Sequence, residues 1–202
     1  MLPGIKQFDL SGKVAVITGG SKGLGEAMAA GLASAGANLM LVSRNDAEAK
    51  AVAAKLAKEY DCKAIGFAAD VSKQADMEAM AAEAIDALGQ VDILINSAGI
   101  NTRGPIDELS YEQFSEVQRI NVDGIWLACR AVLPHMKQRQ YARIVNMASA
   151  PGLVAPPNRT PYATSNGGAV QLNLALPLEL AGHGTHVNPI APGSSRPPPH
   201  TP

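Results

Sequence analysis

Cysteine and charged residues are scarce in this chain, and each scarcity argues against a class of protein. Only two of its 202 residues are cysteine, Cys62 and Cys129, and their spacing is not that of a metal-binding or redox pair. We therefore expect reduced packing residues rather than a disulfide framework. Charged residues make up 17% of the chain and the formal net charge is −1. This balance provides no basic face for nucleic acid or anionic lipid, so neither partner is expected.

Long apolar runs are missing as well. The first residues, MLPGIKQFDLSGK, lack the apolar stretch of a signal peptide, and no stretch has the length of a membrane-spanning helix. We therefore expect a cytoplasmic protein. Hydrophobic residues nevertheless account for 47% of the chain, which is typical of a folded domain, and the length suits a single one. The proline-rich tail 194–202, SSRPPPHTP, has no apolar period and is expected to be disordered.

Short aliphatic runs alternate along the chain with longer alanine-rich segments whose apolar residues recur at helical spacing. The runs predict strands at 14–18, 38–42, 63–68, 91–96, 142–147 and 185–190. The segments predict helices at 23–35, 47–60, 72–88, 111–138 and 161–181. Strands separated by helices pair in parallel through right-handed crossovers, so we expect a doubly wound parallel sheet of the Rossmann type. Ligands of such sheets bind beyond the carboxyl ends of the strands.

Two of the expected helices begin with the pattern of a capping box. Asn45 stands three residues before Glu48, and Ser110 stands three residues before Gln113. In a capping box each side chain accepts a hydrogen bond from the backbone amide of the other residue. These pairs are therefore expected to satisfy the first free amides of their helices.

A glycine-rich loop, TGGSKGLG from Thr18 to Gly25, follows the first strand and leads directly into the first helix. Gly19 permits a tight turn, Gly23 lets the backbone approach a pyrophosphate, and Gly25 allows the helix to pack on the strand. The helix N-terminus adds free amides and a partial positive charge. The loop therefore favours dinucleotide binding, and the alternative is that its glycines only form a turn.

The spacing T-G-x-x-x-G-x-G and three later motifs resemble those of the short-chain dehydrogenase/reductase family. Asp70-Val71 is similar to the pair that contacts adenine in that family, Asn96-Ser97-Ala98-Gly99 to its N-N-A-G, and Asn121-Val122-Asp123-Gly124 to its N-V-x-G. Asp70 could instead cap a helix and Asn96 could belong to a turn, but the order of the motifs favours the family. The resemblance implies a dinucleotide-binding Rossmann domain over residues 8–193.

The residues after the second strand favour NADP(H) over NAD(H). NAD-binding Rossmann units place a carboxylate there for the ribose 2′-hydroxyl, whereas this chain has Ser43, Arg44 and Asn45. Lys22 in the glycine loop adds a second cation, and arginine forms charge-assisted hydrogen bonds with a phosphate. The alternative is that both cations are solvated surface charges. With the resemblance, the expected cofactor contacts are Gly19, Ser21, Lys22, Gly23, Leu24, Gly25, Ser43, Arg44, Asn45, Asp70, Val71, Asn96, Ala98, Gly99, Pro192 and Gly193.

The resemblance also implies a reaction, hydride transfer between NADP(H) and a ketone or secondary alcohol. Ser149 and Tyr162 have the family's spacing, and residues 160–166 resemble its Y-x-x-x-K box. In relatives the tyrosine donates a proton to the substrate oxygen, the serine holds that oxygen, and the helix asparagine, here Asn121, holds a water. A lysine one turn after the tyrosine binds the nicotinamide ribose and lowers the tyrosine pKa. Here Asn166 occupies that position.

Three departures from the family follow Tyr162. Asn166 is neutral and cannot supply the cation that favours tyrosinate. Pro177 predicts a kink or an early end of the last helix. Relatives continue well beyond Gly193, so the chain is expected to be truncated at its C-terminus relative to the family and to lack a substrate-covering segment. We therefore expect an impaired NADP(H)-dependent oxidoreductase.

Two alternatives remain open. The first is a non-catalytic dinucleotide-binding or assembly protein derived from the family, and the second is an error in the sequence after Asn166. Helices 111–138 and 161–181 form the dimer interface in relatives, which implies a homodimer or homotetramer. His183 and His186 are interpreted as loop residues and no metal site is expected. Arg103 resembles an arginine of sugar-acid dehydrogenases, so the nearest members are expected among these or the 3-oxoacyl reductases, with a small-molecule substrate.

Overall fold

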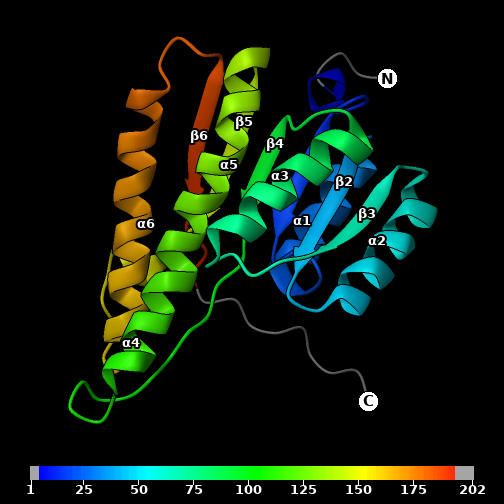
Figure 1. The fold of residues 1–202 in the computed structure, drawn as a ribbon. Coiled ribbons are helices and arrows are strands. Elements are labelled where there is room, and N and C mark those ends of the chain that lie inside the picture. Colours follow the sequence, from blue (N-terminus) through cyan, green and yellow to red (C-terminus); the bar gives the residue numbers. More distant parts are fainter. Residues whose placement is uncertain (1–4, 194–202) are drawn as a thin grey trace.

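The computed structural model describes residues 5–193, and the predicted disordered tail 194–202 lies outside the described residues. Six strands form one parallel sheet in the order β3-β2-β1-β4-β5-β6 (Figure 1). The strands are β1 Val14–Thr18, β2 Asn38–Ser43, β3 Ala64–Ala68, β4 Ile93–Asn96, β5 Ala142–Met147 and β6 Thr185–Ile190. The predicted doubly wound parallel sheet of a single domain is confirmed.

Helices connect the strands and cover both faces of the sheet. They are α1 Gly23–Ser34, α2 Asp46–Tyr60, α3 Gln74–Leu88, α4 Tyr111–Gln118, α5 Gly124–Arg139 and α6 Thr160–Glu179. α1 and α2 pack on one face, and α3, α5 and α6 contribute to the core on the other (Figure 1). Two short 3-10 helices, Ile5–Phe8 and Ala150–Gly152, lie outside these layers. Within residues 5–193, no helix has both the length and the apolar content needed to cross a bilayer.

Side chains of the central strands β1 and β2 pack into two separate hydrophobic cores, one on each face of the sheet. Ile17, Leu39 and Leu41 pack with small residues of α1 and α2, whereas Val16 and Met40 point to the opposite face and pack with α3 and α5. Neighbouring residues of a strand point to opposite faces, so β1, whose sequence VAVIT is buried at all five positions, is covered on both sides.

The strands on the β6 side of the sheet are covered less completely. β5 alternates between buried residues, Ala142, Ile144 and Asn146, and partly exposed ones on its other face. In β6 only Val187 is buried. This alternation is typical of a sheet with one solvated face, so the β1 and β2 half of the sheet is more deeply embedded than the β5 and β6 half.

The single helix predicted at 111–138 is wrong in one respect. A π-helical segment, Arg119–Asp123, separates α4 from α5. Such segments insert one extra residue into a helical turn, often at functional sites, and the apolar pattern does not reveal them. The sequence also predicts that Pro177 kinks or ends the last helix. α6 continues through Pro177 and ends at Glu179, two residues before the predicted end, so the effect on its length is small.

Only one of the two predicted capping boxes is complete. Ser110 and Gln113 exchange both hydrogen bonds at the start of α4. At the start of α2, Asn45 Oδ1 accepts from the Glu48 amide at 3.2 Å, but the Asn45 amide donates to Ser43 Oγ at 3.2 Å. The carboxylate of Glu48 is therefore free to bond elsewhere.

Candidate functional site

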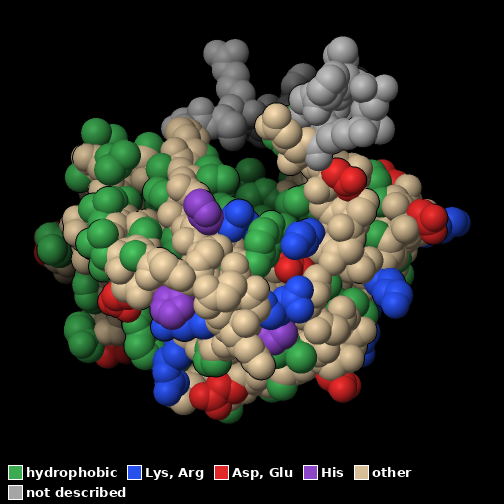
Figure 2. All heavy atoms as spheres, turned by 90° about the horizontal axis from the view of Figure 1, so that it is seen from above, with side chains coloured by type: hydrophobic (Ala, Val, Ile, Leu, Met, Phe, Trp, Pro, Cys, Tyr) green, Lys and Arg blue, Asp and Glu red, His purple; other side chains and the backbone are tan. Residues whose placement is uncertain are grey.

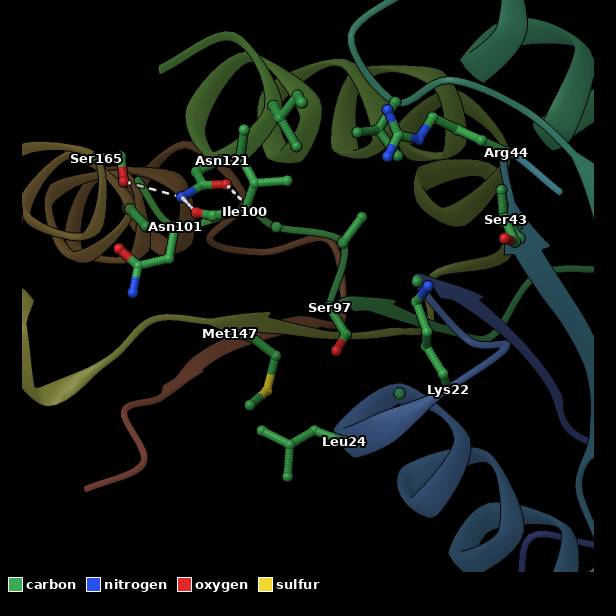
Figure 3. A pocket seen from close by; sticks show the side chains of 18 of the residues that line it. Lys22, Leu24, Ser43, Arg44, Ser97, Ile100, Asn101, Asn121, Met147 and Ser165 are labelled. Carbon is green, nitrogen blue, oxygen red and sulfur yellow. Dashed lines mark hydrogen bonds between the residues drawn. The ribbon is translucent and has the colours of Figure 1, made fainter. Parts of the chain in front are cut away.

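A cavity of about 440 Å³ lies beyond the carboxyl ends of the strands, where ligands of doubly wound sheets bind. Its walls come from the glycine loop, the residues that follow β2, β3, β4 and β5, the π-helical segment and the first turns of α6. Figure 3 shows Lys22, Ser43 and Arg44 at one end of this cavity and Asn121 and Ser165 at the other. The two ends are called the glycine-loop end and the α6 end below.

Close packing shapes the glycine loop. Gly19 has a φ of +66°, and a Cβ on it would lie 2.8 Å from the backbone nitrogen of Ala98. A Cβ on Gly25 would overlap the carbonyl oxygen of Gly19. Gly23 has a φ of +59°, a left-handed conformation that favours glycine. The loop therefore forms a tight turn, and the start of α1 packs directly against that turn.

The N-terminus of α1 lies at the glycine-loop end with its first amides uncapped. Its N-cap residue, Lys22, makes no side-chain capping hydrogen bond, and Leu24 and Gly25 of its first turn line the cavity. Free amides and the helix dipole attract an anion. A nicotinamide dinucleotide fits this donor set, because its pyrophosphate is an anion of suitable size for one helix N-terminus.

Charged groups surround the same end. Lys22 and Arg44 line the cavity beside Ser43, and Asp70 lines it from the end of β3. Burial disfavours the ionised form of Asp70, but hydrogen bonds from Ser72 and the nearby cations Lys73 and Arg44 outweigh it and lower the pKa of its carboxyl. Asp70 Oδ1 accepts from Ser72 Oγ at 2.8 Å and from the Ser72 amide at 3.0 Å. The aspartate is therefore held ionised by the turn that precedes α3.

At the α6 end, polar side chains bond to one another. Asn121, in the π-helical segment, accepts from the Ile100 amide at 2.8 Å and donates to the Ile100 carbonyl at 2.9 Å and to Ser165 Oγ at 3.0 Å. Ser165 Oγ donates in turn to the Tyr162 carbonyl at 2.9 Å. Asn121 thereby fixes the loop after β4 to the first turns of α6, and both hydrogens of its amide group are engaged.

Asn166 lines the cavity one helical turn after Tyr162. Its Nδ2 donates to the carbonyl oxygen of Tyr162 at 2.8 Å, within the same helix. The side chain is almost completely buried. Its amide is therefore directed at the helix backbone, and the position carries no charge.

Most of the predicted site residues line this one cavity, and a few do not. Those that line it are Gly19, Ser21, Lys22, Leu24, Gly25, Ser43, Arg44, Asp70, Val71, Ala98, Gly99, Asn121, Tyr162 and Asn166. Within the described part of the chain, the residues outside its wall are Gly23, Asn45, Asn96, Ser149, Pro192 and Gly193.

Two of the residues outside the wall still lie on segments next to it. Ser149 follows β5 and precedes the 3-10 helix Ala150–Gly152, in which a Cβ on Gly152 would lie 2.9 Å from the Asn166 carbonyl. This segment therefore packs directly against α6. The Ala150 amide donates to the Pro192 carbonyl at 3.2 Å, which ties the residues after β6 to the same place.

A chain of buried amides behind the cavity was not predicted. Asn96 Nδ2 donates to Asn146 Oδ1 at 2.8 Å, Asn146 Nδ2 donates to Asn173 Oδ1 at 3.0 Å, and Asn173 Nδ2 donates to the Ala169 carbonyl at 2.7 Å. It links β4, β5 and α6. The signal in the sequence is Asn146 itself, a polar residue on the face of β5 that also carries Ala142 and Ile144.

A second unpredicted contact joins α2 to the glycine loop. Ser21 Oγ donates to Glu48 Oε2 at 2.9 Å, and Ser21 is 4% exposed. The capping pattern of Asn45 and Glu48 assigned this carboxylate to its own helix. Its true partner lies 27 residues away in the sequence, so no local pattern reveals the contact.

Comparison with known proteins gives a consistent result. The family described as short chain dehydrogenase matches residues 13–200. The chain is 38% identical to D-threitol dehydrogenase of Mycolicibacterium smegmatis over 92% of its own length and 71% of the relative's. It is 36% identical to 3beta-hydroxysteroid dehydrogenase 1 of Eggerthella lenta over 94% of its own length and 73% of the relative's.

Solved structures of other dehydrogenases have a similar fold. A gluconate 5-dehydrogenase from Burkholderia cenocepacia, in complex with NADP and tartrate, superposes with a TM-score of 0.90 at 33% identity, covering 94% of this chain and 74% of that one. A xylitol dehydrogenase with bound NAD+ superposes with a TM-score of 0.88 at 31% identity, covering 91% of this chain and 71% of that one. Both kinds of nicotinamide dinucleotide therefore occur in structures that resemble this one.

Proposed function

Because the chain belongs to the short-chain dehydrogenase family, we propose that it binds NADP(H) through a domain formed by residues 8–193 and interconverts a ketone and a secondary alcohol. The observation that carries the choice of cofactor is the pair of cations, Lys22 and Arg44, at the glycine-loop end of the cavity. Ser43 ends β2 where NAD-binding Rossmann units have a carboxylate. In this proposal the 2′-phosphate of NADP(H) lies beside the cations Lys22 and Arg44 and the hydroxyl of Ser43.

The proposed cofactor contacts follow from the walls of the cavity. The first amides of α1 would hold the pyrophosphate, Asp70 and Val71 the adenine, and Ala98 and Gly99 the part of the dinucleotide near β4. A bound nicotinamide dinucleotide supplies the hydride of the reaction. Asn121 acts in this proposal through the loop after β4, because its side chain holds Ile100 by two hydrogen bonds.

Tyr162 is the proposed proton donor and Ser149 the proposed partner of the substrate oxygen. Tyr162 lines the cavity and Ser149 lies on the segment that packs against α6. An ordinary tyrosine has a pKa near 10, so proton transfer at neutral pH benefits from a nearby cation. Asn166 provides none, and we therefore propose that the reaction of this chain is slow.

The proposed substrate is a small hydroxylated or carboxylated molecule. D-threitol dehydrogenase, xylitol dehydrogenase and the gluconate 5-dehydrogenase with bound tartrate are all similar to this chain. Arg103 lies on the exposed loop after β4, and that loop is tied to the segment before α6 by a hydrogen bond from the Gly104 amide to the Asn158 carbonyl at 3.0 Å. A guanidinium at this place suits a carboxylate or a polyol.

The proposed oligomer, a homodimer or homotetramer, uses the surface of α5 and α6. Trp126 on α5 is 51% exposed, and Leu174 and Leu178 on α6 are 60% and 80% exposed. A groove of about 520 Å³ that includes Trp126 and Leu176 lies between the two helices. Exposed apolar side chains on these helices favour association. Cys62 and Cys129 are free thiols, which are typical of a reducing compartment, so a cytoplasmic location belongs to the proposal.

One observation favours the rival function, a dinucleotide-binding protein without catalysis. Asn166 Nδ2 is bonded to the backbone of its own helix at 2.8 Å, and its neutral side chain supplies no cation for tyrosine activation. Binding and turnover therefore have to be measured separately.

Fluorescence titration with NADPH and with NADH tests the proposed cofactor. We expect tighter binding of NADPH, and we expect Arg44→Asp to reverse the order because it replaces a cation beside the 2′-phosphate by a like charge. Equal affinities in the unchanged protein would remove the argument for NADP(H). Absence of any binding would refute both the enzyme and its non-catalytic rival.

A further inference from the structure

Glu48 occupies the position of a capping-box acceptor but does not act as one. Its backbone amide donates to Asn45 Oδ1 at 3.2 Å, as in a normal N-cap. The reciprocal bond is missing, because Ser43 Oγ accepts from the Asn45 amide instead. The Glu48 carboxylate extends to the glycine loop and accepts a hydrogen bond from Ser21 Oγ at 2.9 Å. The bond between Ser21 and Glu48 therefore takes the place of the capping-box bond from the Asn45 amide to Glu48.

The contact brings a negative charge behind the glycine-loop end of the cavity. Ser21 lines that cavity together with Lys22 and Arg44. Among the described residues, neither cation nor any other is within ion-pair distance of Glu48. The carboxylate is only partly exposed, so solvent screens its charge less than that of a surface glutamate.

The same contact also engages a hydroxyl. A serine hydroxyl has one hydrogen to donate, and that of Ser21 is directed at Glu48 rather than at the cavity. A phosphate near Ser21 would therefore meet an oxygen lone pair and a carboxylate behind it, both unfavourable. A ribose 2′-hydroxyl carries no charge and can donate a hydrogen bond, so neither feature opposes it.

We propose that Glu48 is a specificity-determining residue that weakens binding of NADP(H) relative to NAD(H) by acting against the 2′-phosphate through Ser21. This inference rests on the proposed dinucleotide function. Lys22 and Arg44 attract the phosphate and Glu48 opposes it, so the preference for one dinucleotide is set by the balance of the two. The solved relatives with NADP and with NAD+ fit a site in which small changes shift that balance.

Glu48→Gln tests the charge alone, because glutamine keeps an oxygen that can accept the bond from Ser21. Removal of one like charge at the edge of the site is expected to tighten NADPH binding by about 3- to 10-fold. NADH binding should change by less than about twofold, since its 2′-hydroxyl is neutral. Glu59→Gln is the matched control, because Glu59 is exposed near the other end of the same helix. It should change neither affinity.

Titration of the full chain and of both variants with NADPH and NADH gives a decisive comparison. A gain for NADPH alone, in Glu48→Gln alone, supports the inference. No gain, or an equal gain for both dinucleotides, overturns it even if the unchanged protein binds them as proposed. Failure of the unchanged protein to bind either dinucleotide overturns the proposed function and this inference together. Thermal unfolding of each variant confirms that the fold is retained.

Discussion

The two ends of the cavity differ in how far their polar groups are already bonded within the protein. At the glycine-loop end, α1 begins without a side-chain cap, and Lys22 and Arg44 have no ion-pair partner among the described residues. At the α6 end, Asn121, Ser165 and Asn166 all donate to other groups of the chain. Donors are therefore available to a ligand at the first end and mostly engaged at the second.

This difference implies that the protein is better prepared to bind a dinucleotide than to catalyse the proposed reaction. A dinucleotide can be held by amides and cations that the first end provides without rearrangement. The proton transfer proposed for Tyr162 benefits from a nearby cation, and the second end has the neutral amide of Asn166 instead. The sheet shows the same contrast, since β1 is buried along its whole length and β5 only on alternate residues. The half of the sheet beside the glycine loop is thus the more completely buried one.

The largest expected effect comes from restoring charge at the α6 end. Asn166→Lys places a cation one turn from Tyr162, and a cation within about 4 to 6 Å shifts a neighbouring pKa by roughly 1 to 3 units. Lowering the tyrosine pKa by that amount is expected to raise the rate of carbonyl reduction by roughly 10- to 1,000-fold. Steady-state rates with NADPH over a panel of polyol ketones and keto acids measure the change.

A charge added elsewhere on the same helix controls for general electrostatics. Gln171 is exposed on α6, so Gln171→Lys adds the same charge away from the cavity and should leave the rate unchanged. If the unchanged protein already turns over as fast as Asn166→Lys, the α6 end is not deficient and the contrast between the two ends fails.

A second large effect is expected behind the α6 end, in the chain of buried amides. Asn146→Ala removes the acceptor of Asn96 Nδ2 and the donor to Asn173 Oδ1, both of which are buried. An unsatisfied buried polar group costs about 1 to 3 kcal/mol, so the loss in unfolding free energy should be about 2 to 4 kcal/mol.

Urea denaturation measures this loss, with Asn188→Ala as the control. Asn188 lies on the adjacent strand β6 and is exposed, so its replacement should have little effect. A loss below about 0.5 kcal/mol for Asn146→Ala would show that the amide chain does not stabilise this half of the sheet.

The sequence predicts most of the fold and part of the site, for reasons visible in particular residues. β1, β5 and β6 have the predicted bounds because each is a short apolar or alternating run with clear ends. The predicted cavity residues of the glycine loop and of the strand ends meet because parallel strands share one carboxyl edge. These features depend on local pattern and on general topology.

The remaining features depend on contacts between distant segments. The π-helical turn that positions Asn121 has no apolar signature, since its residues continue the pattern of the helices on either side. Glu48 matched a local capping box, yet its carboxylate bonds to Ser21, 27 residues away in the sequence. Competition between a local and a distant partner is decided by the packing of α2 against the glycine loop, which the sequence alone does not reveal.

A smaller effect is expected at the glycine-loop end from a change in backbone packing that leaves the charges of this end unaltered. Gly25→Ala would bring its Cβ into the Gly19 carbonyl oxygen. Overpacking of this kind costs about 1 to 3 kcal/mol, and displacement of the loop should weaken NADPH binding by about tenfold or more. Gly31→Ala is the control, because nothing lies within 4 Å of a Cβ at that position of α1.

The two glycine variants should therefore change stability in opposite directions. Alanine is the better helix former by about 0.5 to 1 kcal/mol, so Gly31→Ala should raise the thermal midpoint while leaving NADPH affinity unchanged. If Gly25→Ala binds NADPH as the unchanged protein does, close packing of the loop is not what prepares this end for the cofactor.

The smallest effect is expected at the amino ends of the strands, on the side of the molecule away from the cavity. Cationic and histidine side chains gather on this side (Figure 2). His135 on α5 accepts a hydrogen bond from the Val91 amide through Nε2 at 3.3 Å. Burial and the nearby Arg139 lower the pKa of His135 below its ordinary value of 6.5, although Asp92 opposes them. The folded protein thus favours the neutral ring, which alone can accept this bond.

Stability from His135 is therefore present above the unfolded pKa of 6.5 and is lost as the pH falls through the lower folded-state pKa. Because the ring is only partly buried, the loss should be under about 1 kcal/mol. Urea denaturation between about pH 7.5 and about pH 5.5 measures it. His135→Gln keeps an acceptor for Val91 without titrating and should flatten this part of the profile. His186→Gln, exposed on β6, should not flatten it. An unchanged profile in His135→Gln would show that the bond to Val91 contributes no pH dependence to stability.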